Sequence, residues 1–214
     1  MKKALIFRGG WDGHEPVETS EIVAAELRKR GMEVDIFDDQ ECLLAGDLAE
    51  KYSLIIPVWT MGGISGDAEK ALLNAVQSGV GLGGWHGGMC DAFRKNTDYQ
   101  FMTGGQWVAH PGGIIDYRVN IISDDPIVKG IADFDFRSEQ YYMHTDPGNE
   151  VLATTRFNGS TAPWIDGTVM PVVWKRKFGA GRVFYCSLGH QAEEFKKYPQ
   201  FLEIVVRGLL WAAK

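Results

Sequence analysis

The hydrophobic pattern of the first 90 residues alternates between short apolar runs and longer amphipathic stretches. Apolar runs suited to buried strands occupy residues 3–7, 33–37, 53–58 and 80–82. Residues 17–30 and 67–77 instead repeat apolar positions at helical spacing, and a glycine follows each stretch within two residues. This alternation of strands and helices predicts a parallel sheet whose connections are right-handed crossovers.

The second half of the chain has a different pattern. Strands are expected at residues 114–122, 138–144, 150–155, 170–175 and 181–187, before a closing amphipathic helix at residues 199–213. Residues 94–113, rich in glycine and aromatic residues, are predicted to form a long lid or binding loop. The expected fold is a single α/β domain over residues 1–214, with a mostly parallel central sheet flanked by helices and antiparallel strands added at one side.

Composition and charge indicate which binding partners and which cellular compartment are expected. The net charge is −6 with no basic block, which argues against nucleic acid as a partner. The three cysteines are far apart and odd in number, which argues against a disulfide framework and indicates a reducing compartment. The apolar run near the N-terminus is too short for a signal peptide, and no stretch reaches membrane-spanning length. We therefore expect a soluble cytoplasmic protein.

The most informative stretch is residues 80–90, which read Val-Gly-Leu-Gly-Gly-Trp-His-Gly-Gly-Met-Cys. A buried strand followed by closely spaced glycines predicts a sharp strand-to-helix turn, as in a nucleophile elbow. Ligands of open α/β sheets bind beside such turns, at the carboxyl edge of the strands. The residue at the apex is His86, a poor nucleophile but a good acid or base. We therefore expect the floor of an active site here.

Four histidines are expected at this same rim of the sheet, at His14, His86, His110 and His190. One histidine in such a position is more often structural than catalytic, but four at one rim favour a function. Glu139 is the best candidate for a carboxylate partner because it interrupts an apolar and aromatic strand, although a solvent-facing glutamate fits the same pattern. The expected catalytic residues are His86, Glu139, His110 and His190.

Tryptophans also gather next to the expected rim, at Trp11, Trp59, Trp85 and Trp107. Flat aromatic faces stack on sugar rings, although a single tryptophan is by default a packing residue. Their clustering favours a carbohydrate-like ligand. The expected substrate-binding residues are His14, Trp11, Trp59, Trp85, Gln106, Trp107 and Gln191.

Two other motifs do not indicate a function. Residues 79–84 match the dinucleotide fingerprint G-x-G-x-x-G, but they precede their strand, and no acidic residue follows at the required distance. Cys90 lies four residues beyond the apex of the turn, in the expected helix, where nothing in the sequence indicates the lowered pKa of a nucleophilic thiol.

A family resemblance rests on several motifs together. They are Gly13-His14, Gly84-Trp85-His86-Gly87-Gly88, Gly105-Gln106-Trp107 with His110-Pro111, the stretch 171–190, and the closing Arg207-Gly208 and Trp211-Ala212. With them the chain resembles the ThuA-like, or trehalose-utilisation, family over essentially its whole length. The resemblance implies a class I glutamine amidotransferase-like sheet related to flavodoxin. It also implies a role in sugar catabolism, especially of 3-keto derivatives of disaccharides such as trehalose.

The turn departs from that of true amidotransferases, where a cysteine stands in the place of His86. Glutaminase chemistry needs that thiolate for its acyl intermediate, so we do not expect ammonia release from glutamine. We expect instead an isomerase, lyase or hydrolase acting on a sugar or keto-sugar. A 3-keto group acidifies the neighbouring C–H bond, so a base can start the reaction without a redox cofactor. His86 would be the acid or base, Glu139 its partner, and His110 and His190 would polarise the carbonyl.

Two alternatives remain open on the sequence. In the first, His86, His110 and His190 form a three-histidine site for zinc or manganese, although no two have the spacing of ligands on one helix. In the second, the chain is a non-catalytic sugar-binding or regulatory protein on an amidotransferase-like scaffold, which a fold alone does not exclude. A homo-oligomer is expected for this type of fold, without a surface stripe that identifies the interface.

Overall fold

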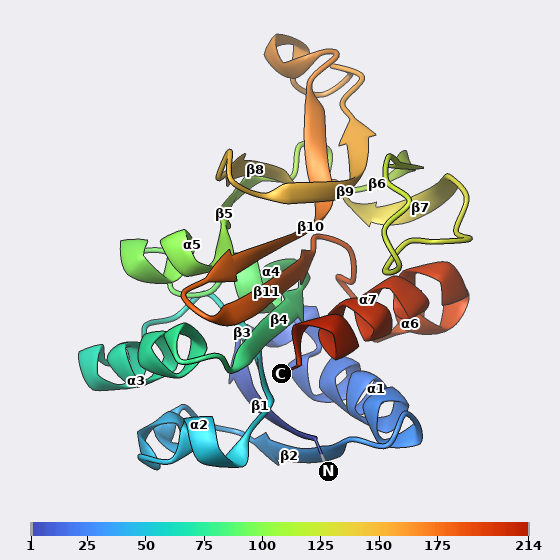
Figure 1. Ribbon diagram of the computed structural model, residues 1–214. Helices are drawn as coiled ribbons and strands as arrows, with labels where there is room; N and C mark the ends of the chain where they lie inside the picture. The colour runs from blue at the N-terminus through green and yellow to red at the C-terminus, as the bar shows by residue number, and fades with distance from the viewer. Residues whose placement is uncertain (1, 214) are drawn as a thin grey trace.

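The apolar runs of the first half form the parallel strands of a twisted sheet, as the computed structural model of residues 2–213 shows (Figure 1). The neighbouring strands, in order across the sheet, are β2 (Glu33–Phe37), β1 (Lys3–Gly10), β3 (Leu54–Thr60), β4 (Gly81–Trp85) and β11 (Gly181–Cys186). Every neighbouring pair in this set is parallel. This is the strand order of flavodoxin-like sheets, so the expected fold class is confirmed.

The second half extends the same sheet beyond β11 with antiparallel strands. They are, in order, β10 (Val169–Phe178), β9 (Glu150–Arg156), β6 (Ile114–Ile121) and β7 (Phe134–Glu139). The pairing of β10 with β9 shifts register around Pro171 and Val173, and irregularities of this kind bend a sheet. In Figure 1, β6, β7 and β9 therefore lie above the parallel strands.

Helices cover both faces of the parallel part (Figure 1). One face carries α1 (Pro16–Lys29), α6 (Ala192–Lys197) and α7 (Pro199–Ala212), and the other carries α2 (Leu48–Lys51), α3 (Gly66–Gln77) and α5 (Thr97–Thr103). The strand alternation distributes side chains to both layers: Ile6 faces the core under α1 and α7, whereas Leu5 and Phe7 face the core under α3. Each such fully buried side chain contributes about 1.5–3 kcal/mol relative to an exposed one.

Two sequence predictions about the middle of the chain were wrong. Residues 94–113 are not one long loop, because they contain α5 and β5 (Gly105–Ala109). The expected strand 138–144 is two strands: β7 ends at Glu139, and β8 (Tyr142–Thr145) pairs with β5 in a separate small sheet. The break comes at Gln140, whose side chain donates hydrogen bonds to Thr155 Oγ1 and to a backbone carbonyl of β9, so the chain turns there.

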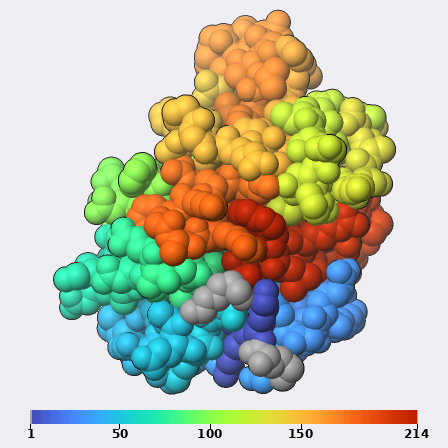
Figure 2. Space-filling model, viewed as in Figure 1, coloured from blue at the N-terminus to red at the C-terminus, as the bar shows by residue number. Residues whose placement is uncertain are grey.

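The remaining elements are short. They are the helical turns η1 (Asp12–His14), η2 (Glu41–Leu44) and η3 (Pro163–Ile165), and the helix α4 (His86–Cys90) that follows the expected elbow. The connection between β9 and β10, which includes η3, projects from one end of the molecule (Figure 2). Among residues 2–213, no helix combines the length and apolar character needed to cross a bilayer.

Candidate functional site

Three histidines meet at the carboxyl edge of the parallel strands. His14 ends η1 after β1, His86 begins α4 directly after β4, and His190 follows β11. Their ring centroids are 4.7 Å (His14–His86), 4.9 Å (His14–His190) and 5.4 Å (His86–His190) apart. All three rings are buried.

The turn before α4 has the geometry that the sequence predicts. His86 has a φ of +46°, in the left-handed region that non-glycine residues rarely adopt. Gly87 is required next to it because a Cβ atom there would lie 2.4 Å from Cε1 of His14. The glycine therefore allows the His14 ring to pack directly on the turn, beside His86.

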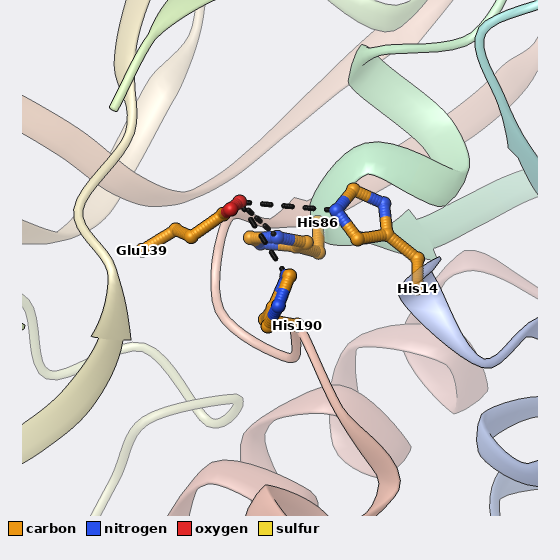
Figure 3. A group of neighbouring side chains, drawn as sticks. All are labelled: His14, His86, Glu139 and His190. Carbon is orange, nitrogen blue, oxygen red and sulfur yellow. Dashed lines mark hydrogen bonds and ion pairs between the residues drawn. The ribbon is translucent and has the colours of Figure 1, made fainter. Parts of the chain in front are cut away.

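The fourth member of the cluster, Glu139, comes from the last residue of β7 and points at all three rings (Figure 3). Its Oε2 lies 3.2 Å from His86 Nε2, 3.8 Å from His14 Nε2 and 3.5 Å from His190 Nδ1. Its Oε1 lies 3.7 Å from Nε2 of a fourth histidine, His110. The carboxylate is buried, so the imidazoles replace most of its hydration.

Hydrogen bonds behind the rings fix the orientation of two histidines. His86 Nδ1 donates to the carbonyl oxygen of Ser187 at 2.7 Å, which turns Nε2 towards Glu139. His14 Nδ1 hydrogen-bonds the hydroxyl of Thr60 at 2.8 Å, and again Nε2 faces the carboxylate. The His86 ring also stacks on Tyr141, with centroids 4.0 Å apart.

Burial and mutual contact set the charges of the cluster. Burial lowers the pKa of His86 to about 3, more than the Glu139 carboxylate raises it, so this ring is neutral near pH 7. Burial raises the pKa of Glu139, but its contacts with the His14, His190 and His86 rings outweigh burial and hold the pKa well below the usual range. Burial lowers the pKa of His190, but contact with Glu139 outweighs it, so the net shift is upward.

A cavity of about 200 Å³ opens above Glu139 and His14. Its walls come from both halves of the chain and include Trp11, Asp91, Arg94, Trp107, His110 and Tyr141. A larger cavity of about 400 Å³, near Leu43, Leu48, Asn74 and Ser78, contains no titratable side chain in its lining. The cavity near Leu43 is larger, but the titratable side chains line the cavity above Glu139. We therefore assign the functional site to the cavity above Glu139.

An ion pair that was not predicted from the sequence, Asp91 with Arg94, forms part of the wall of this cavity. Arg94 donates two hydrogen bonds to the buried Asp91 carboxylate, at 2.5 and 2.8 Å, and its guanidinium carbon lies 4.4 Å from the Trp107 ring centroid. Burial nevertheless raises the pKa of Asp91. The three-residue spacing of Asp91 and Arg94, directly after the strand-to-helix turn, could have indicated this ion pair. Tyr141 was missed as well, since its role depends on the break after β7.

Backbone strain is concentrated at the same place. Within residues 2–213, the non-glycine residues with positive φ are Glu15, Met61, His86 and Phe93. Glu15 follows His14, Met61 lines the cavity, and Phe93 lies between the paired Asp91 and Arg94. Such conformations cost about 1–3 kcal/mol each and cluster at functional sites, which supports the assignment of the site.

Four predicted substrate-binding residues lie away from this cavity. Trp85 is 2% exposed and packs against Phe195 in the core. Trp59 is half-buried, with its ring against Gly9 and Gly62. Gln106 lines a different cavity, together with His144, and the exposed Gln191 precedes α6 beside a third cavity. Of the predicted binding residues, His14, Trp11 and Trp107 do line the cavity.

A model of the ThuA family, described as trehalose utilisation, matches residues 3–212. The chain belongs to the ThuA family. The family resemblance expected from the sequence motifs is thereby confirmed.

Solved structures of ThuA-like proteins have the same fold. A ThuA-like protein from Parabacteroides merdae is 20% identical with a TM-score of 0.81, over 100% of this chain and 90% of that one. One from Bacteroides uniformis is 22% identical with a TM-score of 0.77, over 99% and 91% of the two chains. A β-galactosidase from Bacillus circulans is 14% identical with a TM-score of 0.63, over 98% of this chain but 31% of that one. No curated protein matches the sequence.

Proposed function

We propose that this ThuA-family protein is an enzyme of sugar catabolism that acts on a disaccharide, or on its 3-keto derivative, in the cavity above Glu139. The observation that carries the proposal is one buried carboxylate surrounded by histidines at the floor of a cavity whose walls include two tryptophans. The trehalose-utilisation description of the family supports a sugar as substrate.

The geometry changes the role first expected of His86. This ring is 1% exposed and does not line the cavity, so it does not reach a substrate. His110 lines the cavity, its side chain is 37% exposed, and its Nε2 faces Glu139. We therefore assign proton transfer with the substrate to His110. Glu139 stays ionised and stabilises the imidazolium that His110 forms when it accepts a proton.

The proposed reaction on a 3-keto-disaccharide needs no redox step. His110 removes the proton from C2, and the electron pair of that C–H bond forms an enolate on the C3 oxygen. The enolate then collapses, the bond from C1 to the bridging oxygen breaks, and that oxygen takes a proton from the imidazolium. The products are one free sugar and one unsaturated keto-sugar, to which water can add. This assignment makes the enzyme a lyase or, with water addition, a hydrolase.

The walls of the cavity suit one sugar ring. Trp11 is 47% exposed, and Trp107 is backed by the Arg94 guanidinium, so both present aromatic faces. A volume of about 200 Å³ is below the roughly 300–1,000 Å³ of sites for drug-sized ligands. One ring of a disaccharide therefore enters, and the second ring stays outside.

The site does not support glutaminase chemistry. The apex of the turn is His86, and the nearest thiol, Cys90, is 1% exposed with a pKa that burial raises. A neutral buried thiol does not attack an amide. The same three free cysteines, Cys42, Cys90 and Cys186, accord with the expected cytoplasmic location. We also propose that the protein is a homo-oligomer. Size-exclusion chromatography with light scattering measures its mass in solution and so tests this proposal.

Turnover assays test the proposal. The protein is incubated with 3-ketotrehalose, trehalose and glutamine, and released sugar and ammonia are measured. We expect release of sugar and none of ammonia, and a loss of about 10²–10⁴-fold in H110A. The matched control is H144A, because His144 is an exposed histidine that lines a different cavity. Tight binding of a disaccharide without turnover would contradict the proposal and favour the sugar-binding alternative.

A further inference from the structure

We propose that His14, His86, His190 and Glu139 bind one divalent transition-metal ion, zinc or manganese, at the floor of the cavity. This inference goes beyond the proposed function, because it holds whichever sugar is the substrate. It also changes the ligand set expected from the sequence: His86 and His190 remain, but His14 and Glu139 replace His110.

The spacing of the four groups fits a metal site. One ligand atom from each residue lies within 4.8 Å of all the others. The three distances from Glu139 Oε2 to the histidine nitrogens are 3.2, 3.5 and 3.8 Å. Neighbouring ligand atoms around a tetrahedral zinc ion lie about 3.3–3.4 Å apart, given bonds of about 2.0–2.1 Å. Two of the distances lie within about 0.2 Å of this spacing, and the longer separations, 3.8 Å and up to 4.8 Å, require the side chains to move inwards when an ion binds.

The ring nitrogens of His86 and His14 that point away from Glu139 make the hydrogen bonds expected of metal-bound histidines. A carbonyl oxygen only accepts, so His86 Nδ1 carries the proton in its bond to Ser187, and the neutral ring has its lone pair on Nε2. That lone pair faces a carboxylate oxygen 3.2 Å away. Two acceptors at this distance repel each other, and a cation between them removes the repulsion. Metal-bound histidines usually donate their other ring nitrogen to such a partner.

Protonating all three rings instead would crowd positive charge into the cluster. Three imidazolium ions with centroids 4.7–5.4 Å apart would place three positive charges around one carboxylate. Glu194 lies behind His190, where its Oε2 accepts from the His190 backbone N–H at 2.8 Å. Glu15 accepts from the Ala192 backbone N–H and holds the same loop.

His190 supplies an independent observation. Its side chain is 9% exposed, and its Nδ1 is buried without a hydrogen-bond partner. The same atom points into the cluster, 3.5 Å from Glu139 Oε2 (Figure 3). A buried polar atom without a partner costs about 1–3 kcal/mol, so its orientation calls for a ligand. A metal ion at the centre of the four groups bonds to this nitrogen.

The composition of the site selects the kind of metal. Imidazole nitrogens favour zinc and other first-row transition metals, whereas magnesium and calcium take oxygen ligands. A carboxylate beside the imidazoles also suits manganese. His14 and Glu139 line the cavity, so the ion would border the place assigned to the sugar. His110 stays outside the set of four and remains free for proton transfer.

Metal titration tests the inference on the full-length protein. Protein purified without chelator is analysed for metals, then stripped and titrated with Zn²⁺, Mn²⁺ and Mg²⁺ by calorimetry. We expect about one equivalent of zinc or manganese and no saturable binding of Mg²⁺. At a metal concentration 100-fold above the Kd, the melting temperature should rise by about 5–10 °C.

Variants identify the ligands. We expect E139Q and H190A to weaken binding by more than the 10–100-fold typical of partners behind the ligands. H110A and H144A remove neighbouring or surface histidines and should keep wild-type affinity. Should a ligand variant fail to fold, Co²⁺ bound to the wild-type protein gives visible ligand-field absorption that Zn²⁺ abolishes. A silent Co²⁺ spectrum, or equal zinc affinity in H190A and H144A, would overturn the inference.

The two proposals fail in different ways. A stripped protein that turns over 3-ketotrehalose at the wild-type rate refutes a role for the metal in that reaction, while the titration still decides whether the ion binds. A protein that binds one equivalent of zinc through the four residues, but turns over no sugar, confirms the metal site and refutes the proposed function. Absence of zinc and manganese binding overturns the inference outright.

Discussion

The parallel and antiparallel halves of the sheet contribute different things to the site. The parallel strands deliver His14, His86 and His190, each from the segment that follows a strand. The antiparallel half delivers Glu139 at the end of β7, and β5 of the separate small sheet adds Trp107 and, directly after the strand ends, His110 to the wall. The first half therefore builds a row of rings that strand direction alone places together. The second half bends over this row and supplies the carboxylate.

Replacing the carboxylate should have the largest effect. Glu139→Gln keeps the size of the side chain but removes the charge that faces four histidines. We expect the turnover of a keto-disaccharide to fall by about 10²–10⁴-fold with the fold retained. Steady-state kinetics and circular dichroism measure the two effects. Glu150→Gln, at an exposed position in the same half, is the matched control. Similar rates in both variants would show that the halves do not share one centre.

A smaller effect is expected when the parallel half alone is disturbed. A Cβ at Gly87 would lie 2.4 Å from the His14 ring, so Gly87→Ala displaces that ring. We expect a loss of about 1–3 kcal/mol in the free energy of unfolding. Denaturant titration measures it. Gly66→Ala is the control, because a Cβ there meets nothing within 4 Å. Equal stability of the two variants would contradict tight packing between the turn and His14.

The comparison between the halves also explains what the sequence could predict. Apolar runs followed by glycines place the loops after β1, β4 and β11 at one edge, so the meeting of His14, His86 and His190 could be anticipated. The position of Glu139 could not be derived in the same way. It depends on the register shift between β9 and β10 and on the break at Gln140, which no local pattern of hydrophobic residues specifies.

The tryptophans show the same limit. The prediction that tryptophans near the rim in sequence line the site was correct for Trp11 and Trp107. It failed for Trp85, which precedes the apex of the turn but points into the core against Phe195. Trp85 is the last residue of β4 and His86 the first of α4, so a position beside His86 gives no information about exposure to the ligand.

A modest effect is expected when the cavity wall that β5 of the small sheet contributes is changed. Trp107→Ala removes one aromatic face and leaves the Arg94 guanidinium uncovered. We expect KM for the keto-disaccharide to rise by about 2- to 10-fold with kcat little changed. Trp164→Ala, 85% exposed on the projecting connection, is the control. A fall in kcat without a change in KM would assign Trp107 to the reaction instead of to binding.

The smallest effect concerns the helices that support the parallel half. Glu203 on α7 accepts hydrogen bonds from Arg207 and from Arg30 at the end of α1, at 2.8 and 2.9 Å. Burial raises its pKa, but the two arginines outweigh burial and lower it. Since the folded pKa is depressed, this stabilisation is present above about pH 4.5 and is lost as the pH falls through the folded pKa.

Glu203→Gln should therefore lower the free energy of unfolding by about 0.5–1 kcal/mol at pH 7. The difference from the wild type should shrink as the pH falls below about 4.5, because the wild-type carboxylate is then protonated. Denaturant titrations across this range measure both. A difference that stays constant with pH would assign the effect to packing instead of to charge. Catalysis should be unchanged, since this pair lies on α7 and does not line the cavity.

A crystal structure of zinc-loaded protein, with anomalous data collected at the zinc edge, shows whether the two halves assemble one metal centre. The predicted result is a single strong peak about 2.0–2.2 Å from His14 Nε2, His86 Nε2, His190 Nδ1 and an oxygen of Glu139. A structure in which this cluster holds no zinc, while zinc is found at surface histidines such as His144, would contradict the shared centre.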